Sequence, residues 1–438
     1  MITDTELLRI VRVYQTTLSL RQTAKQLNSS KSTIRRRLQL AKDRGLIAAP
    51  TDTPTVEDKR TPDGRTITSA GNIRTLAELL EYASVDLDQW VVVRHKVNKW
   101  DSQTKGGGVV GLFQVTAHLE RRAAFFVTPV EVTSRLKRKP LTSQPDTRIT
   151  LIVPDSQHGF RRTDQGLITL HDRRAVDCAI QAARFLADKH GDGFTDIILL
   201  GDMLDLAPFS KYPSTPDLRY TTNQALRELF FFLSELRKAA PKSRIRYAEG
   251  NHELRIHKAL TERIDEALHL RPATVDDDAA TLFSIPHLLS LDQIDVEYIA
   301  PYGKAFFHEG VRFSHGSLVR RRGGQTVGAY LNHATASGVF GHIHRLELAQ
   351  RRIDTPAGAK VITAMSPGCL CRVDGVVPAA TGDTLDWQHG LGLMYASRLG
   401  VHLQLAPILD GVTVIEGHTI AGQTRAADIE KATGIVAD

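Results

Sequence analysis

Five short polar clusters, each directly behind an apolar, strand-like run, constrain this chain more than any other feature. They are Asp155-Ser156-Gln157-His158, Gly201-Asp202-Met203-Leu204-Asp205, Gly250-Asn251-His252-Glu253, Ser314-His315-Gly316 and Gly341-His342-Ile343-His344. From residue 148 onward, apolar runs alternate with stretches of helical length, and this alternation is typical of a layered α/β sheet. Such sheets bind ligands just beyond the carboxyl ends of their strands. The five clusters fall at these positions.

The periodicity of the apolar residues predicts the elements of this part of the chain. Strands are expected over 149–153, 197–200 and 245–248, because each is a short apolar run. Helices are expected over 174–189 and 223–239, where apolar residues recur at helical spacing. The polar clusters therefore lie on connections between strands and helices.

The side chains of the clusters suit transition metals. Carboxylate and amide oxygens mixed with imidazoles favour Mn²⁺, Fe, Zn²⁺ or Ni²⁺ over Ca²⁺. A carboxylate can bridge two such ions about 3.5–4 Å apart, and the pair then holds the attacking and leaving oxygens of an in-line displacement. The clusters indicate phosphate-ester chemistry at two divalent ions, with Mn²⁺ as the first choice.

The order of the clusters resembles a known family, the calcineurin-like metallophosphoesterases of the phage and actinobacterial type. The pattern of that family reads D-x-H, GDxxD, GNH[ED], H and GHxH, and the resemblance covers about residues 148–400. It implies a four-layer α/β/β/α sandwich as a catalytic domain over 146–417. It implies a first metal on Asp155, Gln157, Asp202 and His344, and a second on the bridging Asp202 with Asn251, His315 and His342. His252 would be the free imidazole that stabilises charge or protonates the leaving oxygen.

One position departs from the family pattern. Two residues after the first aspartate, where the pattern has histidine, this chain has Gln157 followed by His158. The Gln157 amide oxygen is the preferred ligand, and a bend at Gly159 that brings in His158 is the alternative.

Two further positions near the clusters are candidates for supporting roles. Asp205 is expected to orient a ligand histidine through its ring N–H, with plain structural hydrogen bonding as the alternative. Arg320 and Arg321, in a run of three arginines after His315, are candidates to bind substrate phosphates, and a solvated loop is equally compatible with the sequence.

The positive charge of the chain is concentrated at its N-terminal end. Residues 1–50 hold ten of the 56 Lys and Arg but three of the 49 Asp and Glu, which accounts for the whole net charge of +7. Three helices are predicted within 1–48, with Asn28-Ser29-Ser30 as the turn before the third helix and Gly45 at its end. Such a basic module favours a polyanionic partner.

The string RQTAKQLNSSKSTIRRRL resembles resolvase-type and regulator helix-turn-helix motifs. This resemblance implies a DNA-binding domain over 1–48, with protein contacts as the alternative use of a tri-helical unit. The residues expected to face DNA are Ser29, Ser30, Lys31, Ser32, Arg35 and Arg36.

The remaining segments are less informative. Residues 49–71 are rich in Pro, Thr, Asp and Gly and predict a flexible linker. Residues 72–145 predict a small α+β segment of unknown role, with a helix over 76–82 and strands near 90–93 and 113–115. Residues 418–438 predict a weak helix or a tail.

The sequence excludes some classes of protein and leaves others open. No run approaches the roughly 18 apolar residues of a membrane span, and the N-terminus lacks the layout of a signal peptide, so we expect a cytoplasmic protein without membrane contact. The leading hypothesis is a DNA-directed phosphodiesterase or nuclease. A phosphatase with a regulatory DNA-binding module and an inactive DNA-binding scaffold are the alternatives, and the oligomeric state is open.

Overall fold

The computed structural model of the chain contains two compact units, Met1–Ala124 and Phe125–Asp438. It describes residues 2–17, 20–44, 46, 55–61, 64–70, 73–87, 90–103, 109–121, 130, 135–211, 215–356, 358–377 and 386–437. Both units combine helices with β-sheet, so the fold belongs to the α/β class that the sequence predicts.

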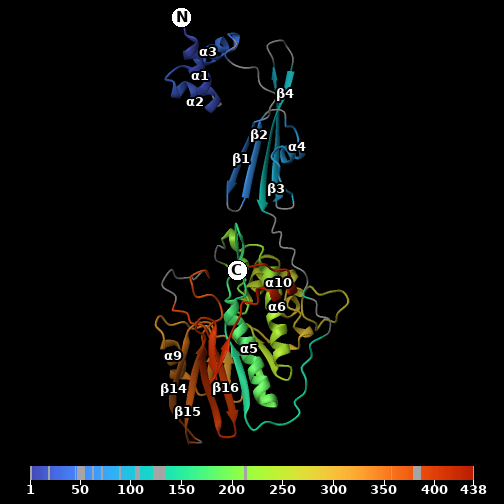
Figure 1. Cartoon of the computed structure of the whole chain (residues 1–438), viewed down its shortest axis with the longest axis vertical. Helices are drawn as coiled ribbons and strands as arrows, with labels where there is room; N and C mark the ends of the chain where they lie inside the picture. The colour runs from blue at the N-terminus through green and yellow to red at the C-terminus, as the bar shows by residue number, and fades with distance from the viewer. Residues whose placement is uncertain are drawn as a thin grey trace. The chain divides into compact units, whose positions relative to one another are not determined.

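Three helices open the first unit (Figure 1). They are α1 (Asp4–Thr17), α2 (Leu20–Gln26) and α3 (Lys31–Asp43). Their buried apolar residues are Leu7, Ile10, Val11, Ala24, Ile34 and Ala41. Ser30 caps α3, because its hydroxyl accepts a hydrogen bond from the N–H of Thr33 at 3.1 Å. The three predicted helices are therefore confirmed as helices, while Gly45 lies outside the described residues.

A four-stranded antiparallel sheet forms the rest of the first unit. Its order is β1 (Thr55–Thr61), β2 (Gly64–Ala70), β4 (Val109–Arg121) and β3 (Trp90–Gln103). Helix α4 (Leu76–Tyr82) has the predicted bounds and packs Leu79 against Ile67 and Val115 of the sheet. The predicted linker over 49–71 is wrong, because β1 and β2 pair through its middle. Strand β1 reads TVEDKRT and is polar because it is an edge strand.

The larger sheet of the second unit has six strands. Their order is β10 (Val296–Ile299), β9 (Arg244–Ala248), β8 (Phe194–Leu199), β5 (Arg148–Val153), β16 (Gly390–Ser397) and β17 (Gly400–Pro407). The first four are parallel to one another, and β16 and β17 are antiparallel to their neighbours. The strands predicted from apolar runs are thus confirmed as β5, β8 and β9.

Two long helices pack on this sheet, α5 (Arg173–His190) and α6 (Thr222–Ala239). Asp172 starts α5, since its carboxylate accepts hydrogen bonds from the N–H groups of Arg174 and Ala175. Gly191 ends α5 with a φ of 53°, a conformation that favours glycine. The helical faces and the strands share one apolar core.

A second sheet packs against the first (Figure 1). Its order is β11 (Phe306–His308), β12 (Val311–Ser314), β13 (Gly338–Phe340), β15 (Gly358–Pro367) and β14 (Leu346–Thr355). Ile152 and Met394 of the first sheet join Phe313 and Met365 of the second in one buried cluster. Helix α9 (Gln325–His333) packs on the second sheet through Val327 and Leu331, and Figure 1 shows it beside β14 and β15.

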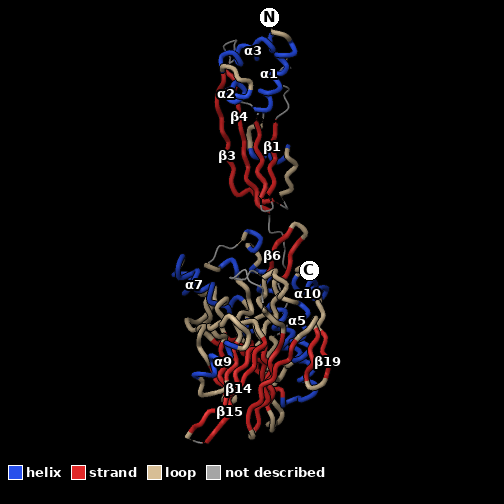
Figure 2. Tube along the Cα trace, turned by 90° about the vertical axis from the view of Figure 1, so that its left-hand side faces the viewer, coloured by secondary structure: helices blue, strands red, loops and turns tan. Residues whose placement is uncertain are grey.

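Shorter elements complete the second unit. They are the hairpin of β6 (Phe160–Thr163) and β7 (Gly166–Thr169), α7 (Leu254–Arg263), α8 (Ile285–Leu288), the pair β18 (Val412–Ile415) and β19 (His418–Ala421), and α10 (Ala426–Thr433). Strands β18 and β19 pack against α5, and Figure 2 shows β19 beside α5. Helix α10 packs against α6 (Figure 1).

Two predicted boundaries differ from the structure. Residues 418–438 are not a tail, because Ile420 and Ile435 belong to the core of the second unit and the N–H of Gln423 donates to Asp177 at 2.9 Å. The predicted segment 72–145 is divided between the units, since Leu136 donates its N–H to the carbonyl of Gln293 at 2.8 Å.

Candidate metal centre

The five polar clusters converge at one edge of the two packed sheets. Asp155 and Gln157 follow β5, Asp202 follows β8, and Asn251 follows β9. These strands are parallel neighbours, so the connections at their carboxyl ends are neighbours too. The second sheet contributes His315 after β12 and His342 and His344 after β13, again from parallel strands. All seven predicted ligands therefore lie in one region.

The side chains of the seven residues face one another at short range. His315 Nε2 lies 3.2 Å from Asp202 Oδ2 and 3.0 Å from Asn251 Oδ1. His344 Nε2 lies 3.3 Å from Asp155 Oδ1 and 3.3 Å from the side-chain amide of Gln157. The two groups correspond to the two predicted metal sites, and Asp202, His315 and His342 present ligand atoms that all lie within 4.8 Å of one another.

Unpaired buried acceptors show that these residues fit a metal ion. Within the described part of the chain, Asp155 Oδ2 and Gln157 Oε1 are buried and have no hydrogen-bond partner. An unpaired buried carboxylate oxygen is costly, and coordination of a cation removes that cost. Burial opposes charge on His315, but Asp202 and Asp155 outweigh it and raise the pKa of His315 to about 10. The cluster thus stabilises positive charge.

Several residues of the same loops have a left-handed backbone conformation. Gln157, Asp202, His342 and His344 have φ values of 46°, 50°, 71° and 56°. Residues other than glycine rarely adopt this left-handed conformation, which costs of the order of 1–3 kcal/mol each when imposed. Four of the seven predicted ligands are held in it, and strain of this kind is found mainly at functional sites.

Two glycines allow the loops to approach the ligands closely. A Cβ at Gly341 would collide with Asp155 Oδ2, and a Cβ at Gly250 would collide with the carboxylate and N–H of Asp202. The N–H of His342 also donates to Asp155 Oδ1 at 2.9 Å. These glycines are therefore required by packing around the two carboxylates.

We expect Gly341→Ala to weaken Mn²⁺ binding by about tenfold or more, because the new Cβ displaces Asp155 and outer-shell changes alone cost about 10- to 100-fold. Isothermal titration with Mn²⁺ measures the effect. Gly328→Ala in α9 is the matched control, since its Cβ would have nothing within 4 Å. Equal affinity for Mn²⁺ in Gly341→Ala and wild type would contradict the ligand role of Asp155.

His252 lies beside the seven residues with its ring fixed on both sides. Its Nδ1 is 2.7 Å from the carbonyl of Asp205, and because a carbonyl only accepts, Nδ1 carries the proton. Its Nε2 is 2.8 Å from Nη2 of Arg255 and 3.7 Å from Asp202 Oδ2. Burial lowers the pKa of His252, although Asp202 opposes this effect. The ring is thus neutral, with Nε2 turned toward the centre.

The structure changes the predicted role of Asp205. The sequence predicts that it orients a ligand histidine, but its carbonyl and carboxylate both face His252, the latter at 3.6 Å from Nδ1. The other carboxylate oxygen accepts from the N–H of Ala207 at 3.0 Å. Asp205 therefore positions the free histidine.

The structure separates Gln157 from His158. Gln157 faces His344, as described above, whereas His158 Nδ1 lies 2.9 Å from the Ser156 hydroxyl and 3.2 Å from the Met203 carbonyl. The His158 ring also stacks on His171 with centroids 4.2 Å apart. Nε2 of His158 is buried without a hydrogen-bond partner, but the geometry favours Gln157 as the ligand, because Gln157 is the one of the two that lies against His344.

Glu253 holds two of the ligand loops together, a role the sequence analysis missed. Its Oε2 accepts from the N–H groups of Asp202 and Gly250, both at 2.9 Å. Its Oε1 accepts from the N–H of Leu204 at 3.0 Å and the hydroxyl of Tyr247 at 2.7 Å. Burial and the nearby Asp202 raise the pKa of Glu253 to about 7. The position of Glu253 directly after Asn251 and His252 is the sequence feature that could have indicated this role.

Two buried thiols lie near the outer side of His344, which the sequence analysis also missed. Cys371 Sγ lies 3.7 Å from His344 Nδ1, and the ring of Trp387 meets the His344 ring edge-on at 4.2 Å. Cys369 completes a group of three possible ligand atoms with Cys371 and His344. All three cysteines are free thiols.

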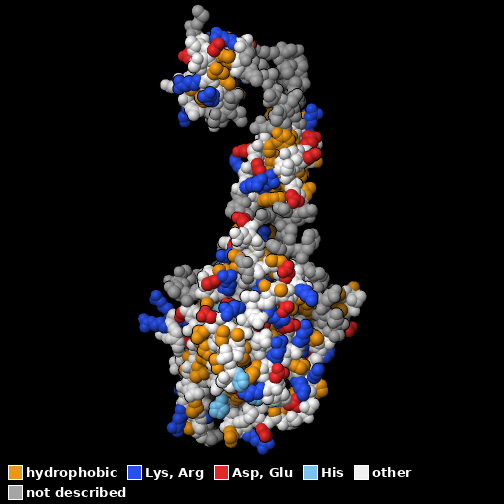
Figure 3. Space-filling view, in the orientation of Figure 1, with side chains coloured by type: hydrophobic (Ala, Val, Ile, Leu, Met, Phe, Trp, Pro, Cys, Tyr) orange, Lys and Arg blue, Asp and Glu red, His pale blue; other side chains and the backbone are white. Residues whose placement is uncertain are grey.

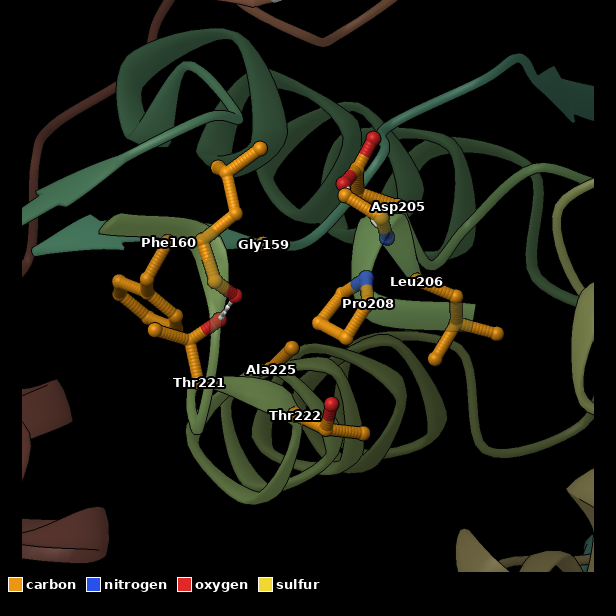
Figure 4. A pocket seen from close by; sticks show the side chains of 10 residues that line it. Gly159, Phe160, Asp205, Leu206, Pro208, Thr221, Thr222 and Ala225 are labelled. Carbon is orange, nitrogen blue, oxygen red and sulfur yellow. Dashed lines mark hydrogen bonds between the residues drawn. The ribbon is translucent and has the colours of Figure 1, made fainter. Parts of the chain in front are cut away.

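A small pocket lies next to Asp205 (Figure 4). Its lining includes Phe160, Leu206, Pro208, Thr221, Thr222 and Ala225. The walls are mostly apolar, and the Thr221 hydroxyl is already bonded to the Leu218 carbonyl at 2.9 Å. The pocket holds about one water molecule and has no room for a nucleotide.

The other candidate residues lie on exposed surfaces. Arg320 and Arg321 are exposed, and their carbonyls accept hydrogen bonds from Arg345. Five of the predicted DNA-facing residues are exposed and the sixth, Ser29, is half-buried. The exposed ones are Ser30, Lys31, Ser32, Arg35 and Arg36.

The comparisons with known proteins leave the function open. No family model matches the chain. The chain is 24% identical over 261 residues to the "Gene 54 protein" of Mycobacterium phage D29, and the alignment covers 57% of this chain and 94% of the phage protein. That name carries no activity. Among the described residues, no helix is both long enough and apolar enough to cross a membrane.

Proposed function

We propose that the second unit is a two-metal phosphoesterase of the calcineurin-like type, with its packed helices and sheets as the four-layer sandwich of that family. The convergence of seven ligand side chains, with buried oxygens of Asp155 and Gln157 unpaired, carries the proposal. Two divalent ions bound here, Mn²⁺ as the first choice, would polarise the phosphate and activate water for an in-line displacement.

The short distances between the ligand side chains assign each of the seven residues to one or both of the two proposed metal sites. Asp155, Gln157 and His344 would hold one ion, Asn251, His315 and His342 the other, and Asp202 would lie between them. Two carboxylates against two divalent cations leave the pocket positive, which attracts a phosphate anion. His252 would face the leaving oxygen through Nε2, held in place by the carbonyl of Asp205.

We further propose that the substrate is DNA and that the three-helix module binds it. The support is the concentration of ten Lys and Arg in residues 1–50 and the exposed Lys31, Arg35 and Arg36 of α3. Figure 3 shows Lys and Arg side chains at several places on the visible face of this module. Hydroxyls and cations at the start of a recognition helix are suited to phosphates and base edges.

One assay separates the candidate functions. The Mn²⁺-loaded protein is incubated with plasmid DNA, with a chromogenic phosphodiester and with a chromogenic monoester. Cleavage of plasmid and diester supports the nuclease. Hydrolysis of the small esters alone supports a phosphatase or phosphodiesterase with a regulatory DNA-binding module, and hydrolysis of none supports the inactive DNA-binding scaffold.

We expect Arg35→Ala/Arg36→Ala to weaken binding to duplex DNA and to reduce the salt slope of log K by about two, because each neutralised phosphate contributes roughly 0.9. Fluorescence anisotropy over a salt series measures both quantities. Hydrolysis of a small diester is expected to stay at the wild-type rate.

The control for this pair is Lys360→Ala/Arg398→Ala, which removes two exposed charges from the second unit. If both double variants bind DNA with the wild-type salt slope, the proposed role of α3 is wrong.

A further inference from the structure

Arg255 places a guanidinium at the edge of the candidate metal centre. It lies in the first turn of α7 and is half-buried. Its Nη1 donates to the carbonyl of Asp205 at 2.6 Å, and its Nη2 donates to Nε2 of His252 at 2.8 Å. The same Nε2 is 3.7 Å from Asp202 Oδ2. Nε2 of His252 therefore lies between the guanidinium of Arg255 and the carboxylate of Asp202, the proposed bridging ligand.

The partners of this guanidinium are neutral. Among the described residues, no carboxylate forms a salt bridge with Arg255, although Asp205 is close. The Asp205 carboxylate is instead turned toward Ala207 and His252. Removing the charge of an arginine from water is costly, and an anion offsets that cost best. The charge of Arg255 therefore lacks its usual counterpart in this protein.

We propose that Arg255 binds the phosphate group of the substrate. This inference rests on the proposed phosphoesterase function and adds a residue to its substrate site. The guanidinium exchanges its bond to His252 Nε2 for a non-bridging phosphate oxygen, because the anionic oxygen attracts the guanidinium charge whereas Nε2 of His252 is neutral. The exchange leaves Nε2 of His252 free to face the leaving oxygen. Arg255 thus couples phosphate binding to the release of the histidine.

The carbonyl of Asp205 makes this exchange geometrically simple. Nη1 stays on that carbonyl, while Nη2 changes its acceptor by rotation of the flexible arginine side chain. The carbonyl also receives Nδ1–H of His252, so it anchors both side chains at once. No proton or covalent bond is transferred in this step.

The test measures binding of inorganic phosphate to the full-length, Mn²⁺-loaded protein, which requires no turnover. We expect Arg255→Ala to raise the phosphate Kd about tenfold or more, as for loss of one hydrogen bond between charged groups. Arg255→Lys should recover part of the loss because it restores the charge. Bound manganese, measured by elemental analysis, should match wild type in both variants.

Arg263→Ala is the matched control, since Arg263 is an exposed arginine in the last turn of the same helix. It should leave the phosphate Kd unchanged. In steady-state assays with a chromogenic diester, Arg255→Ala should raise KM, whereas a purely structural role would lower kcat without changing phosphate binding.

Two outcomes overturn the inference. One is a wild-type phosphate Kd in Arg255→Ala. The other is loss of manganese from that variant, which would mean that the guanidinium only holds the Asp205 loop. If the wild-type protein binds manganese and phosphate but hydrolyses no ester, the proposed function is wrong. The role of Arg255 in phosphate binding is still tested in that case, because the comparison of phosphate Kd between the variants requires no turnover.

Discussion

Asp202→Asn should abolish ester hydrolysis and remove manganese from at least one of the two proposed sites. The Asp202 carboxylate is the proposed bridge between the two groups of ligands and lies 3.2 Å from His315 Nε2 and 3.7 Å from His252 Nε2. A neutral amide at this point would withdraw one negative charge from both cations. We expect activity to fall by more than about a hundredfold, since changes to outer partners of metal ligands already cost about 10- to 100-fold.

Elemental analysis of purified protein and a diester assay measure the two effects of Asp202→Asn. Asp188→Asn provides the control, because Asp188 is an exposed carboxylate on α5. Circular dichroism checks that both variants are folded. If folded Asp202→Asn retains full manganese and full activity, the aspartate does not bridge metals.

His252→Ala should lower kcat by roughly a hundredfold to ten-thousandfold, the range expected for loss of a positioned acid–base group. Manganese content should stay near the wild-type value, because His252 contacts Asp205 and Arg255 and is not among the seven proposed ligands. Initial rates at saturating diester, together with elemental analysis, separate these two effects.

His257→Ala is the matched control for this substitution, since His257 is an exposed histidine on α7, the helix that begins two residues after His252. It should leave kcat unchanged. Loss of manganese from His252→Ala would show that this histidine is a metal ligand and that the division of roles is wrong.

The position of the site was predictable from the sequence because its residues follow apolar strands. Runs such as 149–153 and 245–248 are buried on both faces, so they are mostly apolar, apart from Thr150 and Arg246, and stand out in the sequence. Polar residues directly behind them, Asp155 and Asn251 among them, then fall at the carboxyl ends of neighbouring parallel strands. Strand order was not needed for this inference.

Other parts of the fold gave no comparable pattern. Strand β1 is an edge strand with polar residues on most positions, so its composition matched that of a linker. The burial of the C-terminal residues 418–437 depends on α5 and α6, which lie far away in the sequence. Both β1 and the C-terminal segment form through contacts with other segments of the chain. Local composition does not predict such contacts.

Some supporting contacts of the site depend on loop conformation. Asp205 approaches His252 because Leu206, with φ of 51°, turns the chain after it. Cys371 reaches His344 from a segment after β15 that ends beside the centre. Spacing in the sequence predicts neither approach. The sequence therefore predicts Asp205 beside a ligand histidine instead of His252, and it gives no indication that Cys371 lies beside His344.

Measurement of bound metal tests the proposed two-metal centre most directly. Protein purified without chelator and supplied with Mn²⁺ should bind two ions per chain by elemental analysis, and a crystal soaked in Mn²⁺ should show two anomalous peaks near Asp202, one beside His344 and one beside His315. The same preparation should hydrolyse a phosphodiester, and removal of manganese should stop the reaction. Folded protein that holds no transition metal and gains no activity with Mn²⁺ would contradict the account.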